Sequence, residues 1–194
     1  MLKNRVAIIT GSGRGIGKAA ALLFAKEGAK IVVVDIDSKP AENTAKEIKE
    51  KGYKCICING DMTNPDMAHE IVSKTIRKWG VIHIIINNAG YTWNSMFHKM
   101  TDEQWNSMLD IHMTAPFRLI RAAAPYYREA AKKEKAEGRI VNRKIINVSS
   151  LSGIRGMISQ TNYSAAKAGL IGFSRALAKE WGSFNVQVNS VGFG

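Results

Sequence analysis

The chain has 194 residues, of which 45% are hydrophobic and 23% charged, a composition that is typical of one folded domain and excludes a disordered chain. Its longest apolar runs, such as 31–34 and 82–86, are far shorter than the roughly 20 residues that cross a bilayer, and no secretory signal follows Met1, so we expect a cytoplasmic protein without a membrane-spanning helix. The net charge of +12 could attract nucleic acid, an anionic membrane surface or an acidic carrier, or it could reflect only the solvated faces of amphipathic helices such as 46–51. We expect neither a nucleic-acid nor a membrane partner.

Hydrophobic periodicity predicts strands that alternate with helices. The expected strands are 6–10, 31–35, 54–59, 81–87, 144–148 and 186–191. The expected helices are 15–26, 40–51, 65–79, a long helix that begins near Thr101, and 161–181, while 134–143 is polar enough to be a surface loop or a frayed helix end. Apolar strands separated by helices indicate an α/β fold with a doubly wound parallel sheet, and nothing marks a second domain, so we expect 1–194 to form a single domain.

A glycine-rich turn, Thr10-Gly11-Ser12-Gly13-Arg14-Gly15-Ile16-Gly17, follows the first strand and opens the first helix. Gly11 permits a sharp exit from the strand, and Gly15 and Gly17 leave room for a pyrophosphate at the helix N-terminus, where free amides favour negative charge. We therefore expect this turn to bind a dinucleotide. The alternative is a turn that only joins strand to helix.

An acidic residue ends the second strand at the distance that suits recognition of an adenosine ribose. Asp35 lies 18 positions after Gly17, where it can accept hydrogen bonds from ribose hydroxyls and would repel a 2′-phosphate. Arg14 favours a cofactor that carries the 2′-phosphate, because its guanidinium could pair with that phosphate. We expect NAD(H), with NADP(H) as the alternative. Asp61, at the end of the third strand, is a candidate partner of adenine or a turn residue.

Tyr163 and Lys167 are candidates for proton transfer, because residues four apart on a helix share one face. A lysine ammonium nearby favours the phenolate over the phenol, so the tyrosine can exchange protons near neutral pH. Ser150 follows the fifth strand at the sheet edge where active sites of open parallel sheets lie, and its hydroxyl could hold a carbonyl oxygen.

These motifs resemble the short-chain dehydrogenase/reductase family, through TGSGRGIG at 10–17, NNAG at 87–90, NVSS at 147–150 and YSAAK at 163–167. The resemblance implies a Rossmann fold and an oxidoreductase in which Tyr163 is the general acid/base, Lys167 binds the nicotinamide ribose and Ser150 orients the carbonyl. It also implies that Asn87 to Gly90 stabilise the sheet beside the cofactor. The implied cofactor-binding residues are Gly11, Ser12, Arg14, Gly15, Ile16, Gly17, Asp35, Asp61, Met62, Asn88, Ala89, Gly90, Tyr163 and Lys167.

Two features depart from the family pattern. His112 takes the place of a catalytic asparagine in the helix beneath the site, where it either supports the proton relay or only packs. The chain also ends at Gly194, whereas family members usually continue through a substrate-covering segment, so we expect it to be C-terminally truncated relative to the family.

Within the family, Gln160 and the run 166–181 are most similar to 3-oxoacyl-(acyl-carrier-protein) reductases and related acyl-CoA reductases. This resemblance implies a 3-oxoacyl thioester as substrate, contacted by Ser150, Gln160 and Tyr163, and a homodimer or homotetramer. The basic balance suits an acidic acyl carrier protein or a phosphorylated coenzyme. Candidate contacts for such a partner are Arg128, Lys132 and Lys133.

Alternative interpretations stay open. The chain could be a dinucleotide-binding sensor without catalysis, or a dehydrogenase of sugars or steroids. The basic run 128–135, with Arg139, Arg143 and Lys144, has few aromatic residues, which disfavours nucleic-acid binding and leaves an acidic partner open. Cys55 and Cys57 are expected to be reduced core thiols on one strand face, and no metal site is expected.

Overall fold

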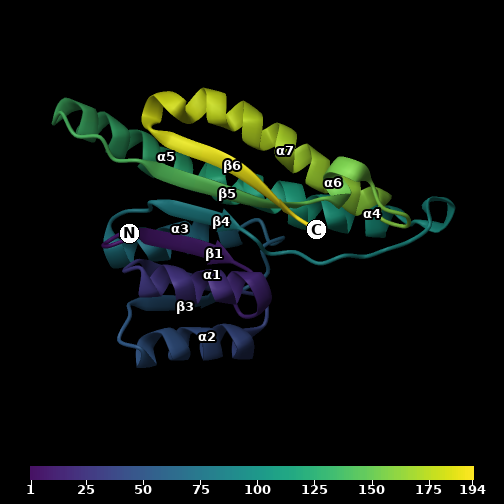
Figure 1. The fold of residues 1–194 in the computed structure, drawn as a ribbon, viewed down its shortest axis with the longest axis horizontal. Helices are drawn as coiled ribbons and strands as arrows, with labels where there is room; N and C mark the ends of the chain where they lie inside the picture. Colours follow the sequence, from purple (N-terminus) through teal and green to yellow (C-terminus); the bar gives the residue numbers. More distant parts are fainter.

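The computed structural model describes residues 1–194 and contains one parallel sheet of six strands in the order β3-β2-β1-β4-β5-β6 (Figure 1). The strands are β1 Val6–Thr10, β2 Lys30–Asp35, β3 Cys55–Asn59, β4 Ile84–Asn87, β5 Arg143–Ser150 and β6 Val186–Phe193. The helices are α1 Gly15–Lys26, α2 Ser38–Glu50, α3 Met67–Trp79, α4 Asp102–Leu109, α5 Ala115–Ala136, α6 Ser152–Arg155 and α7 Thr161–Trp181, with short turns η1 Phe97–Lys99, η2 Asp110–Thr114 and η3 Gly182–Phe184. The doubly wound α/β fold that the sequence predicts is confirmed.

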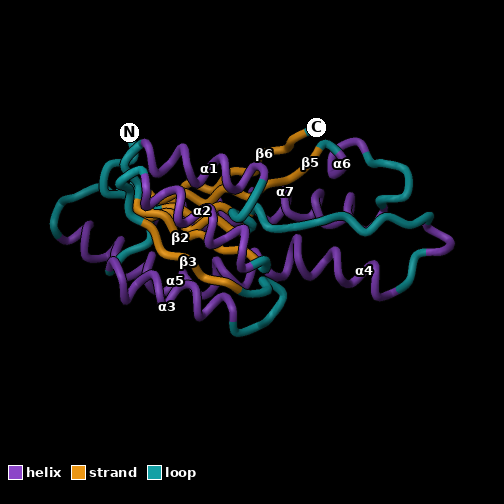
Figure 2. The backbone as a smooth tube through the Cα atoms, turned by 90° about the horizontal axis from the view of Figure 1, so that it is seen from below, coloured by secondary structure: helices purple, strands orange, loops and turns teal.

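Helices cover the sheet on two faces, because strand residues alternate between two cores. Small side chains of α1 and α2 pack on one face against residues such as Ile9 and Ile31. Side chains of α3, α5 and α7 pack on the other face, and Figure 2 shows α1 above the strands with α3 and α5 below them. None of the helices is long and apolar enough to cross a membrane.

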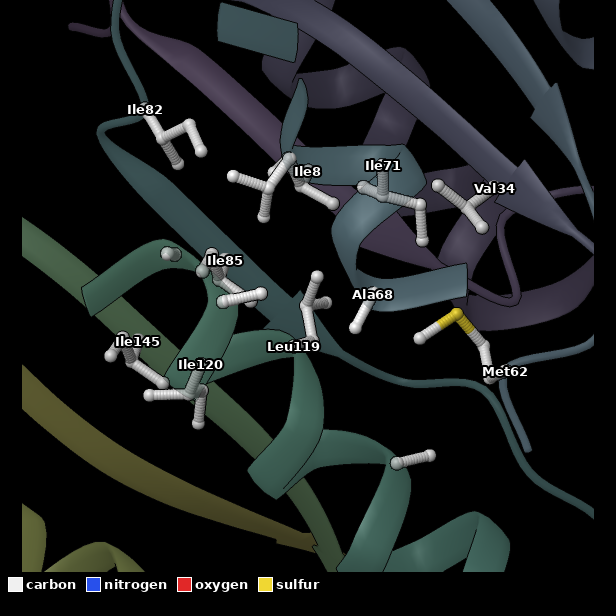
Figure 3. Close-up of a cluster of buried hydrophobic side chains, with 14 of the residues drawn as sticks. Ile8, Val34, Met62, Ala68, Ile71, Ile82, Ile85, Leu119, Ile120 and Ile145 are labelled. Atoms are coloured by element: carbon white, nitrogen blue, oxygen red, sulfur yellow. The ribbon is translucent and has the colours of Figure 1, made fainter. Parts of the chain in front are cut away.

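The larger of the two cores lies between the sheet and the pair α3 and α5. Figure 3 shows Ile8 and Ile85 of the two central strands near Ile71 of α3 and Leu119 of α5, all of which are fully buried. Each such side chain stabilises the fold by about 1.5–3 kcal/mol relative to an exposed one. The core therefore fixes the strand ends and the start of α5, where the candidate site is built.

The long helix predicted after Thr101 is interrupted by one wide turn. Thr101 caps α4 in a reciprocal box with Gln104, with backbone-to-side-chain distances of 3.0 and 3.2 Å. After α4, the turn η2 is a π-helix and contains His112. Pro116 lacks the N–H that would bond to the His112 carbonyl in a regular helix, which favours a wider turn at this point.

The other predicted boundaries differ from the structure by a few residues. β5 and β6 each extend past their predicted ends, β4 begins three residues later than predicted, and α6 was not predicted. Cys55 and Cys57 are half-buried free thiols that pack on the same core.

The prediction of a surface loop or frayed helix end over 134–143 is wrong at both ends. Glu134 lies in α5, Arg143 begins β5, and the two side chains form a buried bidentate ion pair with N–O distances of 2.7 and 2.8 Å. Arg143 is fully buried, so it is not available for docking an acidic partner. The charge of Arg143 suggested an exposed side chain, but a guanidinium can be buried when both oxygens of a partner carboxylate accept hydrogen bonds from it.

Candidate active site

A cavity of about 1000 Å³ lies at the carboxyl ends of the strands, which point toward the C-terminus in Figure 1. Its lining combines the glycine turn after β1 with the ends of β2 to β5 and the start of α7. The predicted site residues in the lining are Gly11, Arg14, Gly15, Ile16, Asp35, Asp61, Met62, Asn88, Ala89, Gly90, His112, Ser150, Tyr163 and Lys167, whereas Ser12, Gly17 and Gln160 lie outside it.

The glycine turn is closely packed at its base and open toward the cavity. Gly11 has a φ of +63°, and a Cβ there would lie 2.7 Å from the Ala89 Cα. A Cβ on Gly17 would collide with the Gly11 carbonyl oxygen, so this glycine lets α1 approach β1. At Gly15, with a φ of +55°, a Cβ would meet nothing within 4 Å. This open space at the N-terminus of α1 fits a pyrophosphate.

Ser12 has a structural position rather than one on the cavity wall. Its buried hydroxyl donates to the Ile9 carbonyl at 2.7 Å and accepts from the Val34 amide at 3.0 Å. These bonds join the turn to β2. The cofactor contact expected for Ser12 therefore stays a prediction that the lining of the cavity does not support.

Three charged residues gather where an adenosine ribose would lie. Asp35 accepts from the Gly13 amide at 2.7 Å and from the Asp37 amide at 3.1 Å, and it lines the cavity. Asp37, which the sequence reasoning missed, also lines the cavity and pairs with Arg14. The guanidinium that could receive a 2′-phosphate is thus already held by a carboxylate.

The segment after β4 binds the two central strands together. The Asn88 side chain donates to the Thr10 carbonyl at 2.9 Å and the Gly11 carbonyl at 3.0 Å, and the Thr10 hydroxyl accepts from the Asn88 and Ala89 amides. Next to it, Asn87 donates to the Asn147 side chain at 2.7 Å. The expected role of this segment in stabilising the sheet agrees with these contacts.

Asp61 is a turn residue, and the adenine contact considered for it stays a prediction. Its carboxylate accepts from the Thr63 amide at 2.8 Å, as a turn residue does, and it also lines the cavity beside Met62. The structure therefore leaves an adenine contact sterically open.

Tyr163 and Lys167 face the cavity from the first turns of α7. The Lys167 ammonium lies 5.5 Å from the centre of the Tyr163 ring and donates to the Val148 carbonyl at 2.6 Å. Burial lowers the pKa of Lys167 from 10.5 to about 8. Ser149 holds this turn of α7 against β5, because its hydroxyl donates to the Lys167 carbonyl at 2.9 Å.

Ser150 ends β5 beside these residues, as predicted from the sequence. Its hydroxyl oxygen accepts from the Ser152 amide at 3.1 Å, which leaves its hydrogen free to donate into the cavity. Gln160 instead accepts from the Ser152 hydroxyl at 3.1 Å. Its substrate contact stays a prediction, since in this arrangement it supports the loop that follows Ser150.

His112 is buried at the base of the cavity. Because the Tyr91 carbonyl can only accept, the contact of 2.7 Å requires Nε2–H to donate to it, which leaves Nδ1 as an acceptor without a partner. The imidazole meets the Tyr163 ring edge-on, with centroids 5.0 Å apart. Burial, with a smaller contribution from the Lys167 charge, lowers the pKa of His112 to about 3. A Cβ on Gly90 would overlap this ring, so Gly90 provides the space that histidine needs here.

Comparison with known proteins agrees with this geometry. The model of the short chain dehydrogenase family matches residues 5–194. The 3-oxoacyl-(acyl-carrier-protein) reductase FabG of Chlamydia muridarum is 37% identical over 98% of this chain and 73% of that protein. The peroxisomal hydratase-dehydrogenase-epimerase of Saccharomyces cerevisiae is 39% identical over 97% of this chain, which spans 21% of that protein.

Solved structures show the same relationship. A crystal structure of a short chain dehydrogenase from Mycobacterium avium superposes with a TM-score of 0.90 at 32% identity, covering 98% of this chain and 68% of that one. The family model and the relatives each cover almost the whole chain. The chain therefore belongs to the short-chain dehydrogenase family.

Proposed function

We propose that this protein is a nicotinamide-dependent oxidoreductase that interconverts a carbonyl and an alcohol, with a 3-oxoacyl thioester as its substrate and Tyr163 as its proton donor. The observation that carries the proposal is that Ser150, Tyr163 and Lys167 line the same cavity as the glycine turn. A proton donor, a hydroxyl for the carbonyl and a place for a dinucleotide are thereby combined at one sheet edge.

In the reduction, Ser150 donates a hydrogen bond to the carbonyl oxygen and so directs it toward Tyr163. The Tyr163 hydroxyl gives its proton to this oxygen while negative charge develops there, and the phenolate that forms lies near the Lys167 ammonium. With a pKa of about 8, Lys167 is charged at neutral pH and close to the pH at which it can itself release a proton. In the oxidation the same groups act in reverse.

The cavity fits a dinucleotide at the glycine turn, where the space at Gly15 and the N-terminus of α1 are both open. Gly11, Asn88 and Gly90 would border it, and Lys167 would reach its nicotinamide ribose. A nicotinamide held there would supply the hydride for the reduction and would accept it in the oxidation.

Asp35 and Asp37 support NAD(H) over NADP(H). Two carboxylates at this end of the cavity repel a 2′-phosphate, and Arg14, the one cation in the turn, is paired with Asp37. NADP(H) binding would require Arg14 to leave that pair. We therefore propose NAD(H) as the preferred cofactor.

The substrate part of the proposal rests on the relatives. Reductases of 3-oxoacyl-(acyl-carrier-protein) and a peroxisomal hydratase-dehydrogenase-epimerase both match nearly the whole chain. A thioester carried by coenzyme A or by an acyl carrier protein also suits a chain with a net charge of +12. A homodimer or homotetramer belongs to the same proposal.

The test is turnover of acetoacetyl-CoA with NADH and with NADPH, followed by nicotinamide absorbance, for the full-length protein and for Tyr163→Phe. We expect turnover with NADH that falls by at least a thousandfold in the variant, because the phenol is the proton donor. Tyr126→Phe, at an exposed position of α5, is the matched control. Equal rates for wild type and Tyr163→Phe would contradict the mechanism. Binding of NADH without turnover of any carbonyl would favour a sensor.

A further inference from the structure

One wall of the active-site cavity is built from two segments that lie far apart in the sequence. The loop that follows β3 contributes Gly60 to Thr63, and the end of α4 with the turn η2 contributes Ser107, Asp110 and Ile111. We call these lining residues the outer wall. The Gly60 amide donates to the Asp35 carbonyl at 3.0 Å, so the outer wall begins beside the residue expected at the adenosine ribose.

Arg118 joins the two segments of the outer wall from behind. Its Nη1 atom donates to the Thr63 carbonyl at 2.8 Å and to the Asp110 carboxylate at 3.3 Å, and its side chain is 24% exposed. The Thr63 carbonyl accepts no other hydrogen bond. Arg118 lies in the first turn of α5 and does not line the cavity, so it can act on a bound ligand only through the outer wall.

Apolar contacts hold the same loop but do not orient it. Met62 and Leu119, the residue after Arg118, both belong to the larger core (Figure 3). Burial of apolar surface has no preferred direction, whereas a hydrogen bond does. The core therefore keeps the loop close to α5, and the bond from Arg118 determines the direction of the Thr63 carbonyl.

The charges that line the cavity give Arg118 a second role. Four carboxylates line it against two cations, while the pyrophosphate of a dinucleotide is itself anionic. Asp37 is paired with Arg14, which also lines the cavity, whereas the counter-charge of Asp110 comes from Arg118, outside the lining. Without Arg118, the outer wall would present an unpaired carboxylate to an anionic ligand, and like charges in a partly enclosed cavity repel. The lining carboxylates are Asp35, Asp37, Asp61 and Asp110, and the lining cations are Arg14 and Lys167.

We propose that Arg118 is a positioning residue for the dinucleotide, which orients the loop after β3 and neutralises Asp110 from behind the outer wall. This inference rests on the proposed function and deepens it, because it assigns cofactor affinity to a residue outside the cavity. An ion pair that is partly open to solvent adds little to the stability of a fold, so the loss of Arg118 should be measured in binding rather than in unfolding. A hydrogen bond made by a charged group corresponds to about 10- to 100-fold in an equilibrium constant. Since the loop keeps its apolar contacts, we expect the lower end of this range.

The experiment measures the Kd of NADH and of ADP-ribose by calorimetry, together with kcat and the KM of NADH, in the full-length wild type, Arg118→Met, Arg118→Lys and Arg121→Met. Methionine keeps the apolar stem of arginine without its charge, whereas lysine keeps the charge. Arg121, less than one turn later in α5, is exposed over the Phe117 ring and is the matched control.

We expect Arg118→Met to bind both ligands about tenfold more weakly and to raise the KM of NADH with kcat unchanged. Arg118→Lys should bind within about threefold of wild type, because one ammonium can neutralise Asp110, and Arg121→Met should bind as wild type does. In the ligand-free protein, the amides of residues 61–64 should exchange with solvent faster in Arg118→Met than in wild type or Arg121→Met, because the loop has lost its bond to α5.

Equal NADH affinities of wild type and Arg118→Met would overturn the inference and leave the reductase standing. A loss of NADH affinity without a loss of ADP-ribose affinity would also overturn it, because the outer wall lies at the adenosine end of the cavity. An equal loss in Arg118→Met and Arg118→Lys would overturn the neutralisation of Asp110. Weaker NADH binding in Arg118→Met, in a protein that turns over no carbonyl, would overturn the reductase but not the role of Arg118.

Discussion

Lys167→Met is expected to change how the stability of the fold depends on pH. In the folded protein burial holds the pKa of Lys167 at about 8, whereas in the unfolded chain it returns to 10.5. Between these values the unfolded chain carries a proton that the folded protein has released, so the free energy of unfolding rises with pH across this window. At about 1.4 kcal/mol per pKa unit, wild type should gain about 2–3 kcal/mol relative to Lys167→Met between pH 7 and 10.

The measurement is urea unfolding by tryptophan fluorescence at four pH values from 7 to 10, with the variant's free energy subtracted from that of wild type at each pH. Groups that titrate equally in both proteins cancel in this difference. Lys132→Met, at an exposed site of α5, is the control and should give a flat difference. If the difference for Lys167→Met is also flat, or falls with pH, burial does not lower the pKa of Lys167 in the folded protein, and our account of its position is wrong.

Further predictions concern the turn, the buried ion pair and the histidine. Gly17→Ala should weaken NADH binding at least tenfold in calorimetry, because the added Cβ would collide with the Gly11 carbonyl oxygen. Gly172→Ala is the control and should bind NADH as wild type does, since its Cβ would meet nothing within 4 Å. Equal affinities of the two variants would contradict the close approach of α1 to β1. Glu134→Gln should lower the free energy of unfolding in urea by about 3 kcal/mol, because it leaves Arg143 buried without its partner charge. Adding Arg143→Met should restore most of that free energy. An unchanged stability of Glu134→Gln would mean that the ion pair is solvated. His112→Ala should lower kcat on the order of 10- to 100-fold at unchanged NADH affinity, because it removes the imidazole ring that packs against the Tyr163 ring and holds it in position. An unchanged kcat would assign His112 to packing alone.

The fold and the centre of the site could be predicted because they depend on local signals. Strand and helix periodicity determines the α/β architecture, and the spacing of Tyr163 and Lys167 places both on one helical face. The missed features depend on side-chain contacts between different structural elements, which hydrophobic periodicity does not predict. No local pattern shows that Ser12 would bond to β2, that Gln160 would turn to Ser152, or that Arg143 would be buried on Glu134. Only Asp37 carried a usable signal, because it stands two positions after Asp35, at the same end of the sheet.

The bonds between Thr10 and Asn88 have a consequence for folding kinetics. They join segments 78 residues apart, at the seam where the β1–β2–β3 half of the sheet meets the β4–β5–β6 half. Pairing within the β1–β2–β3 half joins residues 24 apart, whereas pairing at the seam joins residues 77 apart, so we expect the seam to close after that half has formed. The cavity straddles the same seam, with Gly11 on one side and Ala89 on the other. A dinucleotide would bind only after the halves have joined, and mass action would then slow their separation.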